Sequence, residues 1–391
     1  MRPATLLLSS VFAFALGCGD NGSPACETGS ARLAVVTYNT GLGPGMVALS
    51  TPRAPHVAEA VASTDFDVLC LQEVWTAPDR DAIVTRLGFP VDQVLTADTF
   101  GRNDVPEDRC AQGDLDGIAA CMNAECADAP DEDASLCALD KCQQPLVALY
   151  FAKPHCLHCV AASAGKSAND VENACLSHPV TRIQGGGNGI ILASRWPLLD
   201  PETMPLPAGG ANRVALFARV RVPGAGEVEI ACTHLSANQD VPPPHSGYDD
   251  WGLERDAQFR MISDRLAARA GGRPQLFVGD MNFGVANGSY VRDNDRESWD
   301  QAVSLGFSSP AAEAQPPLCS SCGDNNLHGD SDHGSLIDHA LLRDPSSCPA
   351  LAPAGASRLY DAKETIAGHD GRAVETDLSD HYGIRVVFTA R

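Results

Sequence analysis

PQLFVGDMNF, residues 274–283, is an apolar run that ends in Gly-Asp-Met-Asn and continues into Phe. Such a run is typical of a buried β-strand followed by a polar turn. Two later stretches, LIDHALL (336–342) and LSDHYGI (378–384), each place an Asp directly before a His. Acid–His pairs are common by chance. They gain meaning only if they contribute to one site with the turn after the strand.

The same pattern of an apolar run and a polar end recurs along the chain. Strand-like runs at 31–43, 67–75 and 227–237 also end at, or are interrupted by, polar residues unsuited to a core. The complete set is Asn39, Glu73, His234, Asp280 with Asn282, Asp338, and Asp380 with His381. Several strands that deliver polar side chains at their ends are what an active site on a sheet requires.

Helical patterns alternate with these runs. Residues 55–64 and 82–89 have helical spacing, and 254–272 has Arg in its last turns and Gly just beyond it. Further strands are predicted at 189–198 and 214–222, and the 391 residues suffice for one large domain or two. Gly and Pro are plentiful and aromatic residues are sparse, which favours a mixed α/β protein with many loops.

The formal net charge is -22. A surface this acidic repels nucleic-acid backbones at long range, so broad electrostatic capture of DNA or RNA is disfavoured. A phosphate substrate is not excluded, because a bound divalent cation reverses the local field.

The N-terminus predicts export. Arg2 precedes a short apolar run, Leu6 to Leu16, which is followed by Gly17 and Cys18. The run is too short to span a bilayer and is typical of a signal peptide. We expect residues 1–18 to be a lipoprotein-type signal with lipid attached at Cys18, ordinary secretion being the alternative. Residues 19–30 are expected to be a flexible tether, and no later apolar run is long enough to cross a membrane.

Fifteen cysteines fit an oxidising compartment. Eight of them lie in an acidic, Ala-rich segment at 103–180, where Cys-x4-Cys occurs twice. Two short helices joined by nested bridges, such as Cys121–Cys142 with Cys126–Cys137, would suit that symmetry, although spacing does not fix connectivity. In PHCLHC (154–159) disulfides are favoured over zinc because the chain is expected to be exported.

Five other cysteines receive separate predictions. CSSCGDNN (319–326), with Cys348 nearby, is expected to be another disulfide-bonded loop near Asp338. Cys70 and Cys232 lie in apolar strand-like runs, and we expect both to be reduced core residues, since thiols are often buried there.

A family resemblance rests on six motifs. They are YNT (38–40), LQEVW (71–75), THLSA (233–237), GDMNF (279–283), LIDHALL (336–342) and SDHYGIRVVF (379–388). Their order and spacing resemble those of the endonuclease/exonuclease/phosphatase superfamily. The resemblance covers about 31–100 and 181–391, and it implies one domain, 31–391, interrupted by the cysteine-rich insertion. The implied fold is a four-layer α/β sandwich of two packed mixed sheets flanked by helices, with the site at one end.

The resemblance also implies a metal site. Glu73 would be the principal ligand and Asn39 its neighbour, while Asp380 would contribute to metal or water binding. Carboxylate and amide oxygens are hard donors of the kind that Mg²⁺ accepts, Mn²⁺ and Ca²⁺ being alternatives. Asp338 would pair with His381 at the scissile phosphate, so the two acid–His motifs would belong to one site.

The remaining roles concern the phosphate and the attacking water. Asp280 matches the aspartate that orients or deprotonates the water, and the base role stays open between it and His381. Asn282 would hold the phosphoryl oxygens, and His234 would donate to the phosphate. The substrate-contact candidates are Asn188, which is alternatively only a turn residue, and Arg213, which is alternatively a solvated side chain. His339 is expected to be ordinary strand packing.

These expectations add up to an exported, Mg²⁺-dependent phosphoric-ester hydrolase anchored to the membrane by lipid. A phosphodiesterase of sphingomyelinase or phospholipase C type, with phospholipid as its substrate, is favoured. A secreted nuclease of the deoxyribonuclease I type is the second hypothesis, because nucleic acid suits the composition less well. A non-catalytic lipoprotein that binds partners through the insertion is the third. The oligomeric state stays open, and so does the choice between a substrate-facing lid and a surface elaboration for the insertion.

Overall fold

The computed structural model describes most of the chain. The described residues are 31–97, 110–177, 183–238, 244–245, 247–328, 332–346 and 350–390. The predicted signal peptide, the tether, Cys18 and Cys348 lie outside them. Within the described ranges, no helix combines the length and the apolar character needed to cross a membrane.

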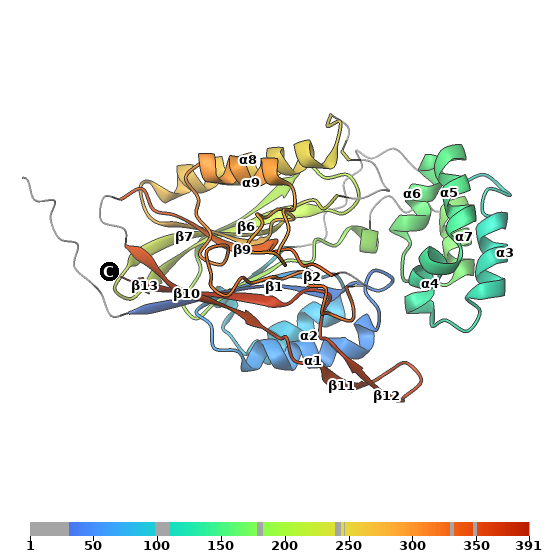
Figure 1. Ribbon diagram of the computed structural model, residues 1–391, viewed down its shortest axis with the longest axis horizontal. Coiled ribbons are helices and arrows are strands. Elements are labelled where there is room, and N and C mark those ends of the chain that lie inside the picture. Colours follow the sequence, from blue (N-terminus) through green and yellow to red (C-terminus); the bar gives the residue numbers. More distant parts are fainter. Residues whose placement is uncertain are drawn as a thin grey trace, which may run out of the picture.

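Two β-sheets pack face to face at the centre of the molecule (Figure 1). The strands described in the first sheet are, in spatial order, β10 (Leu351–Leu359), β13 (Gly383–Ala390), β1 (Arg32–Leu42), β2 (Val68–Val74), β4 (Ile191–Ser194) and β3 (Val94–Thr96). Those described in the second sheet are β5 (Leu199–Leu206), β6 (Arg213–Val222), β7 (Gly226–His234), β8 (Gln275–Asp280) and β9 (Asp338–Arg343). A separate hairpin consists of β11 (Glu364–Ala367) and β12 (Ala373–Thr376).

Helices cover the outer face of each sheet (Figure 1). Below the first sheet lie α1 (Ser50–Ser63) and α2 (Ala77–Leu87), and above the second lie α8 (Trp251–Ala270) and α9 (Arg296–Ser304). Short 3-10 helices occur at η1 (Val91–Gln93), η2 (Asp131–Asp133) and η3 (Ile183–Gly186). The predicted four-layer α/β sandwich is therefore confirmed.

Strand sequences that are apolar on both faces explain this layering. In β1, Val35 contributes to the core between the two sheets, whereas the next residue, Val36, packs between the first sheet and helices α1 and α2. In β8, Val278 belongs to the core between the sheets and Phe277 packs beneath α8. Alternate side chains point to opposite faces of a strand, so a nearly continuous apolar run is what a sheet buried on both sides needs.

The cysteine-rich segment folds as a helical insertion at one end of the sandwich (Figure 1). Its described helices are α3 (Asp116–Glu125), α4 (Ala134–Lys141), α5 (Gln143–Ala152), α6 (Pro154–Ala162) and α7 (Ala168–Ser177). The nested pairing occurs, as Cys121–Cys142 and Cys126–Cys137 join α3 to α4. The two cysteines of PHCLHC form disulfides, as predicted. Their partners lie outside the motif, Cys156 pairing with Cys110 and Cys159 with Cys175.

The insertion also completes a helix of the sandwich. Glu132 Oε1 accepts hydrogen bonds from Ser50 Oγ at 2.9 Å and from Thr51 N at 2.8 Å, at the N-terminus of α1. A carboxylate there offsets the positive end of the helix dipole and satisfies an N–H group without an intrahelical partner. The sequence predicts a helix only from residue 55, whereas α1 begins at Ser50, because this cap comes from a distant part of the chain.

The prediction for Cys70 and Cys232 is wrong. The two cysteines form a disulfide between β2 and β7, with a Cα–Cα distance of 5.5 Å. Both residues are fully buried in the core between the sheets. Their apolar surroundings were read correctly, but the sequence does not show that two strands 162 residues apart face each other across the core. This bridge joins the two sheets covalently.

We expect the double variant Cys70→Ala/Cys232→Ala to lower the free energy of unfolding by about 2–4 kcal/mol, the usual loss for a disulfide that closes a long loop. Urea unfolding followed by tryptophan fluorescence measures the loss. Cys121→Ala/Cys142→Ala is the matched control, because it also removes one disulfide, but one that lies within the insertion and does not join the two sheets. If a non-reducing digest of the native chain contains free Cys70 and Cys232 thiols, the assignment is wrong.

Candidate active site

The strand ends of both sheets meet at one edge of the sandwich. Asn39 lies near the end of β1, and Glu73 lies at the end of β2, the parallel neighbour of β1. In the second sheet β7 and β8 are also parallel, and their final residues His234 and Asp280 are register partners. Asp280 is in turn paired with Asp338, the first residue of β9. This register places the polar side chains predicted from separate motifs next to one another.

Close backbone packing requires glycine at two positions of this edge. A Cβ on Gly279 would lie 1.9 Å from the carbonyl oxygen of Thr233 on β7, and its φ is +149°. A Cβ on Gly41 would lie 2.6 Å from Asp380 Oδ1, and its φ is +54°. L-residues are disfavoured at such φ values. Glycine therefore lets the strand of Asp280 approach the strand of His234, and lets Asp380 approach the end of β1.

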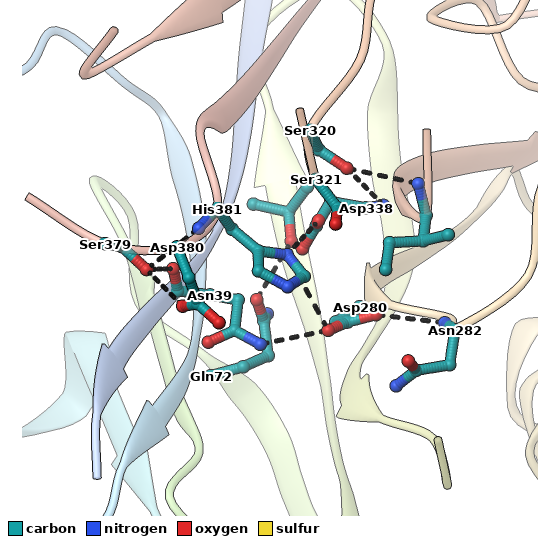
Figure 2. A network of polar contacts seen from close by, with 12 residues as sticks. Asn39, Gln72, Asp280, Asn282, Ser320, Ser321, Asp338, Ser379, Asp380 and His381 are labelled. Carbon is teal, nitrogen blue, oxygen red and sulfur yellow. Dashed lines mark hydrogen bonds and ion pairs between the residues drawn. The ribbon is translucent and has the colours of Figure 1, made fainter. Parts of the chain in front are cut away.

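Asp280 is the centre of the polar network (Figure 2). Asn39 Nδ2 donates to its Oδ2 at 3.0 Å, and the Asn282 N–H donates to its Oδ1 at 2.9 Å. His234 Nε2 lies 3.4 Å from the same Oδ2, and His381 Nδ1 lies 4.0 Å from it. Burial, followed by the charge of Asp338, raises the pKa of the Asp280 carboxyl to about 7.

His381 and Asp338 form a buried pair. His381 Nδ1 lies 2.8 Å from Asp338 Oδ2, so the two acid–His motifs belong to one cluster (Figure 2). Burial opposes protonation of the ring, but Asp338 and the other nearby carboxylates raise the pKa of His381 well above its usual value. The pairing holds Nδ1 in one orientation and leaves Nε2 as the nitrogen available to a substrate.

Glu73 lies on the other side of Asn39. Asn39 Nδ2 donates to Glu73 Oε1 at 3.1 Å, and His234 Nδ1 lies 4.0 Å from that oxygen. Burial, followed by the charge of Asp380, raises the pKa of Glu73. In this geometry the amide nitrogen of Asn39 faces both carboxylates, while its Oδ1 accepts the Gly41 N–H at 3.1 Å.

The donor set fits a divalent cation. Glu73, Asp280 and Asp338 bring three carboxylates into a buried region, with the half-buried Asp380 beside them. Among the described residues, Asp338 Oδ1 and His234 Nδ1 are buried without a hydrogen-bond partner. Buried carboxylates need compensation by opposite charge or hydrogen-bond donors. Hard oxygen ligands with excess negative charge suit Mg²⁺, Mn²⁺ or Ca²⁺.

The two predicted substrate contacts differ in the structure. Arg213 is buried, so the solvated alternative is wrong: its guanidinium lies 5.9 Å from the Trp75 ring centre, and its Nη1 has no hydrogen-bond partner in the described part of the chain. Asn188 Oδ1 accepts the Ile190 N–H at 3.3 Å, and its Nδ2 donates to the Ala97 carbonyl at 3.3 Å. These bonds fit the turn alternative for Asn188.

Comparisons with known proteins agree with the motifs. Residues 36–381 match the sequence profile of the Endonuclease/Exonuclease/phosphatase family. The chain belongs to this family. Members of the family are phosphoester hydrolases, and this chain contains a buried acid–His cluster, Asp280, Asp338 and His381. Among curated proteins, none matches the sequence.

Solved structures of differently named proteins share this fold. SmcL superimposes with a TM-score of 0.55 at 13% identity, covering 92% of this chain and 99% of that one. TDP2 of D. rerio, complexed with a single-strand DNA product, gives 0.52 at 14% identity and covers 92% and 100%. Sphingomyelinase C of Streptomyces griseocarneus gives 0.50 at 16% identity and covers 93% and 100%. At these identities the likeness concerns the fold alone.

Two serines that the motifs did not single out position the network. Ser379 Oγ lies 2.8 Å from the Asn39 carbonyl and accepts the His381 N–H at 3.2 Å, which ties β1 to the C-terminal motif. Ser320 Oγ accepts the Asp338 N–H at 3.2 Å. Ser379 is the first residue of the SDH motif, so it could have been named as a site residue from the sequence. Ser320 lies in the loop predicted to be disulfide-bonded near Asp338, and the Cys319–Cys322 bridge closes that loop. Nothing in the motif marks the Ser320 hydroxyl itself as a partner of Asp338.

His339 has a packing role, as predicted. Its Nδ1 lies 2.9 Å from Ser309 Oγ, and its Nε2 donates to the Phe283 carbonyl at 3.1 Å. Burial lowers the pKa of His339 to about 4, so the ring stays neutral in the folded protein at ordinary pH.

The lowered pKa predicts how stability depends on pH. Above the unfolded value of 6.5 the ring is neutral in both states, whereas below it the unfolded chain binds a proton that the folded chain excludes until about pH 4. His339 should therefore lower the free energy of unfolding by about 3 kcal/mol as the pH falls across this window. The free energy of unfolding of His339→Gln, taken relative to that of the native chain, should therefore rise by this amount as the pH falls from 7 to 4. Urea titrations at both values check this, and a constant difference would contradict it.

Proposed function

We propose that this protein is an exported, metal-dependent phosphodiesterase that hydrolyses phospholipids. The observation that carries the proposal is the Asp280 carboxylate, which contacts Asn39 of one sheet and His234 of the other, 4.0 Å from His381. An acid, two histidines and an amide around one buried point match what phosphate-ester hydrolysis needs: charge stabilisation, water activation and leaving-group protonation.

Glu73 and Asp380 would hold the metal, and Asn39 orients the Glu73 carboxylate by its hydrogen bond of 3.1 Å. Turning the Asn39 amide over would present its oxygen as a further ligand. A bound Mg²⁺ supplies positive charge that neutralises the phosphoryl oxygens and draws the phosphate into an acidic protein. The raised pKa of Glu73, caused first by burial, supports this assignment, because a nearby cation would relieve the cost of its charge.

The side chains around the phosphate have separable tasks. Asp280 and His381 are the two proposed acceptors for the proton of the attacking water, and His381 can act in this way only when its ring is neutral. Asp338 holds His381 Nδ1, so that Nε2 faces the phosphate. His234 would donate to a phosphoryl oxygen, and so would the Asn282 amide, whose Nδ2 is positioned by the Leu235 carbonyl at 3.0 Å. Preorganised donors of this kind stabilise charge that develops in the transition state.

Charge and compartment favour a phospholipid over a nucleic acid. The fold does not separate the two, since both a sphingomyelinase and a DNA-bound TDP2 share it. A net charge of -22 opposes binding to a polyanion but not to a single phosphodiester with a zwitterionic head group. The disulfides of the described chain indicate an oxidising compartment. Lipid attachment at Cys18 would hold the enzyme at a membrane.

We expect Asp280→Ala and His381→Ala each to lower Mg²⁺-dependent hydrolysis of bis-nitrophenyl phosphate by about 10²–10⁴-fold, the range for loss of a general acid or base. Chelation of the metal should abolish the activity, and added Mg²⁺ should restore it. His339→Gln is the matched control, a buried histidine of the same region outside the proposed machinery. Wild-type turnover in both alanine variants would remove the assignment. A parallel screen of sphingomyelin, phosphatidylcholine and DNA separates the phospholipase from the nuclease.

Arg213 provides a further test, because its Nη1 has no partner among the described residues and lies in the field of Glu73 and Asp280. If it binds the phosphate, Arg213→Gln should lower kcat/KM by about 10- to 100-fold, since hydrogen bonds to charged groups contribute about 1.5–3 kcal/mol. Arg219→Gln is the control on the same strand, where the guanidinium instead pairs with Asp200 and Glu227. If the two variants have the same kcat/KM, Arg213 does not bind the phosphate and its role is limited to packing against Trp75.

A further inference from the structure

The helical insertion contains an apolar cleft. Its volume is about 700 Å³, within the usual range for small-molecule sites. The lining is dominated by aliphatic side chains, among them Leu115, Ile118, Met122, Leu157, Val160 and Val171. A site with so few hydrogen-bonding groups would leave the polar atoms of a sugar, a nucleotide or a peptide backbone without partners. The cleft therefore suits a hydrocarbon.

Large apolar side chains stand exposed at the rim of this cleft. Phe151 is 80% exposed, Leu139 60%, Val147 53% and Tyr150 43%. All four line the cleft, and three of them belong to α5, which carries no charged residue. Contiguous exposed apolar groups around a cavity mark an interaction site, because leaving them in water is unfavourable.

The cleft borders a segment that is close in sequence to the candidate active site. Gly45 and Met46 form part of its wall, and they follow β1, the strand that carries Asn39. Met46 packs in one cluster with Trp75, which stands two residues after Glu73. The insertion is fixed against this loop, since a Cβ on Gly45 would lie 2.1 Å from Gly165 N. The cleft and the candidate metal ligand Glu73 are thus linked through the packing of Met46 against Trp75.

The charge of the insertion favours one class of apolar ligand over another. Residues 110–175 contain ten acidic residues against three lysines. An anionic lipid surface would be repelled by this charge, whereas a zwitterionic one would not. The combination of an apolar cleft and an acidic exterior is complementary to a lipid with long hydrocarbon tails and no net charge.

We propose that the cleft of the insertion binds the hydrocarbon tails of a zwitterionic phospholipid whose phosphodiester is hydrolysed at the Asp280 site. The inference rests on the proposed function and adds a lipid-binding site to it. The insertion then acts as the element that draws a single lipid out of a bilayer and orients its phosphate toward the strand ends.

The test uses the full chain carrying Asp280→Asn, so that the lipid stays intact, and phosphatidylcholine vesicles with a photoactivatable acyl chain. After irradiation, mass spectrometry should find label on cleft peptides between residues 115 and 171. Adding Val147→Ser and Phe151→Ser, both at exposed positions, should lower this labelling at least tenfold. Val91→Ser, at a position that is 93% exposed and outside the cleft, should leave it unchanged. Phosphatidylserine vesicles should label the cleft more weakly.

Three results would overturn the cleft assignment. They are label outside the insertion only, equal labelling of the rim variant and the control, and conversion of a dimer to a monomer by the rim variant, which would make the cleft an interface between copies. The active chain separates this inference from the proposed function. Lost labelling with intact phosphatidylcholine hydrolysis rejects the cleft alone, whereas intact labelling without phosphodiester hydrolysis rejects the proposed function alone.

Discussion

The hydrogen bond between Asn39 and Asp280 joins the two sheets at the point where the chemistry is proposed to occur. It exists only if β1 of one sheet and β8 of the other end at the same edge and at the right separation. Behind it the Cys70–Cys232 bridge fixes the distance between the sheets, and the core of branched aliphatic side chains fills the space around that bridge. A small shift of one sheet would separate the proposed catalytic groups, because a hydrogen bond weakens steeply with distance and angle.

Concentrated negative charge is the second constraint. Two buried carboxylates, Asp280 and Asp338, lie in one region with the partly buried Glu73 and Asp380, and the pKa of Asp280 is raised to about 7, first by burial. Such an arrangement lowers stability unless a cation or donors compensate it. Asn39, His234 and the Asn282 N–H supply donors, His381 supplies positive charge through its pair with Asp338, and Arg213 adds a buried cation nearby. A divalent metal would neutralise the negative charge that remains. The stability that the metal-free protein loses by burying this charge would then be recovered when the metal and the substrate bind.

The insertion interrupts the fold without disturbing it. It contributes the Glu132 cap of α1 and a backbone contact at Gly45, while its own helices are held together by four disulfides in the described residues. A small helical unit has too little core to be stable alone, and covalent bridges make up the difference. Because the disulfides stabilise the insertion, it does not need to bury every apolar side chain, and Phe151 and Val147 are exposed around the cleft. Recognition of the substrate and chemistry on it can thus reside in separate parts of the chain.

The sequence by itself determined the layered α/β class, the family, and the residues that stand at the strand ends, because a polar side chain that ends an apolar run is visible without coordinates. Its cysteines also predicted disulfide bonds within the insertion, which the structure contains. Only the tertiary structure decided which groups touch: the Cys70–Cys232 bond, the burial of Arg213, the amide orientation of Asn39 and the support from Ser320. The reason is that strand periodicity fixes the face on which a side chain lies, whereas the partner across a sheet or between sheets depends on how segments hundreds of residues apart pack together.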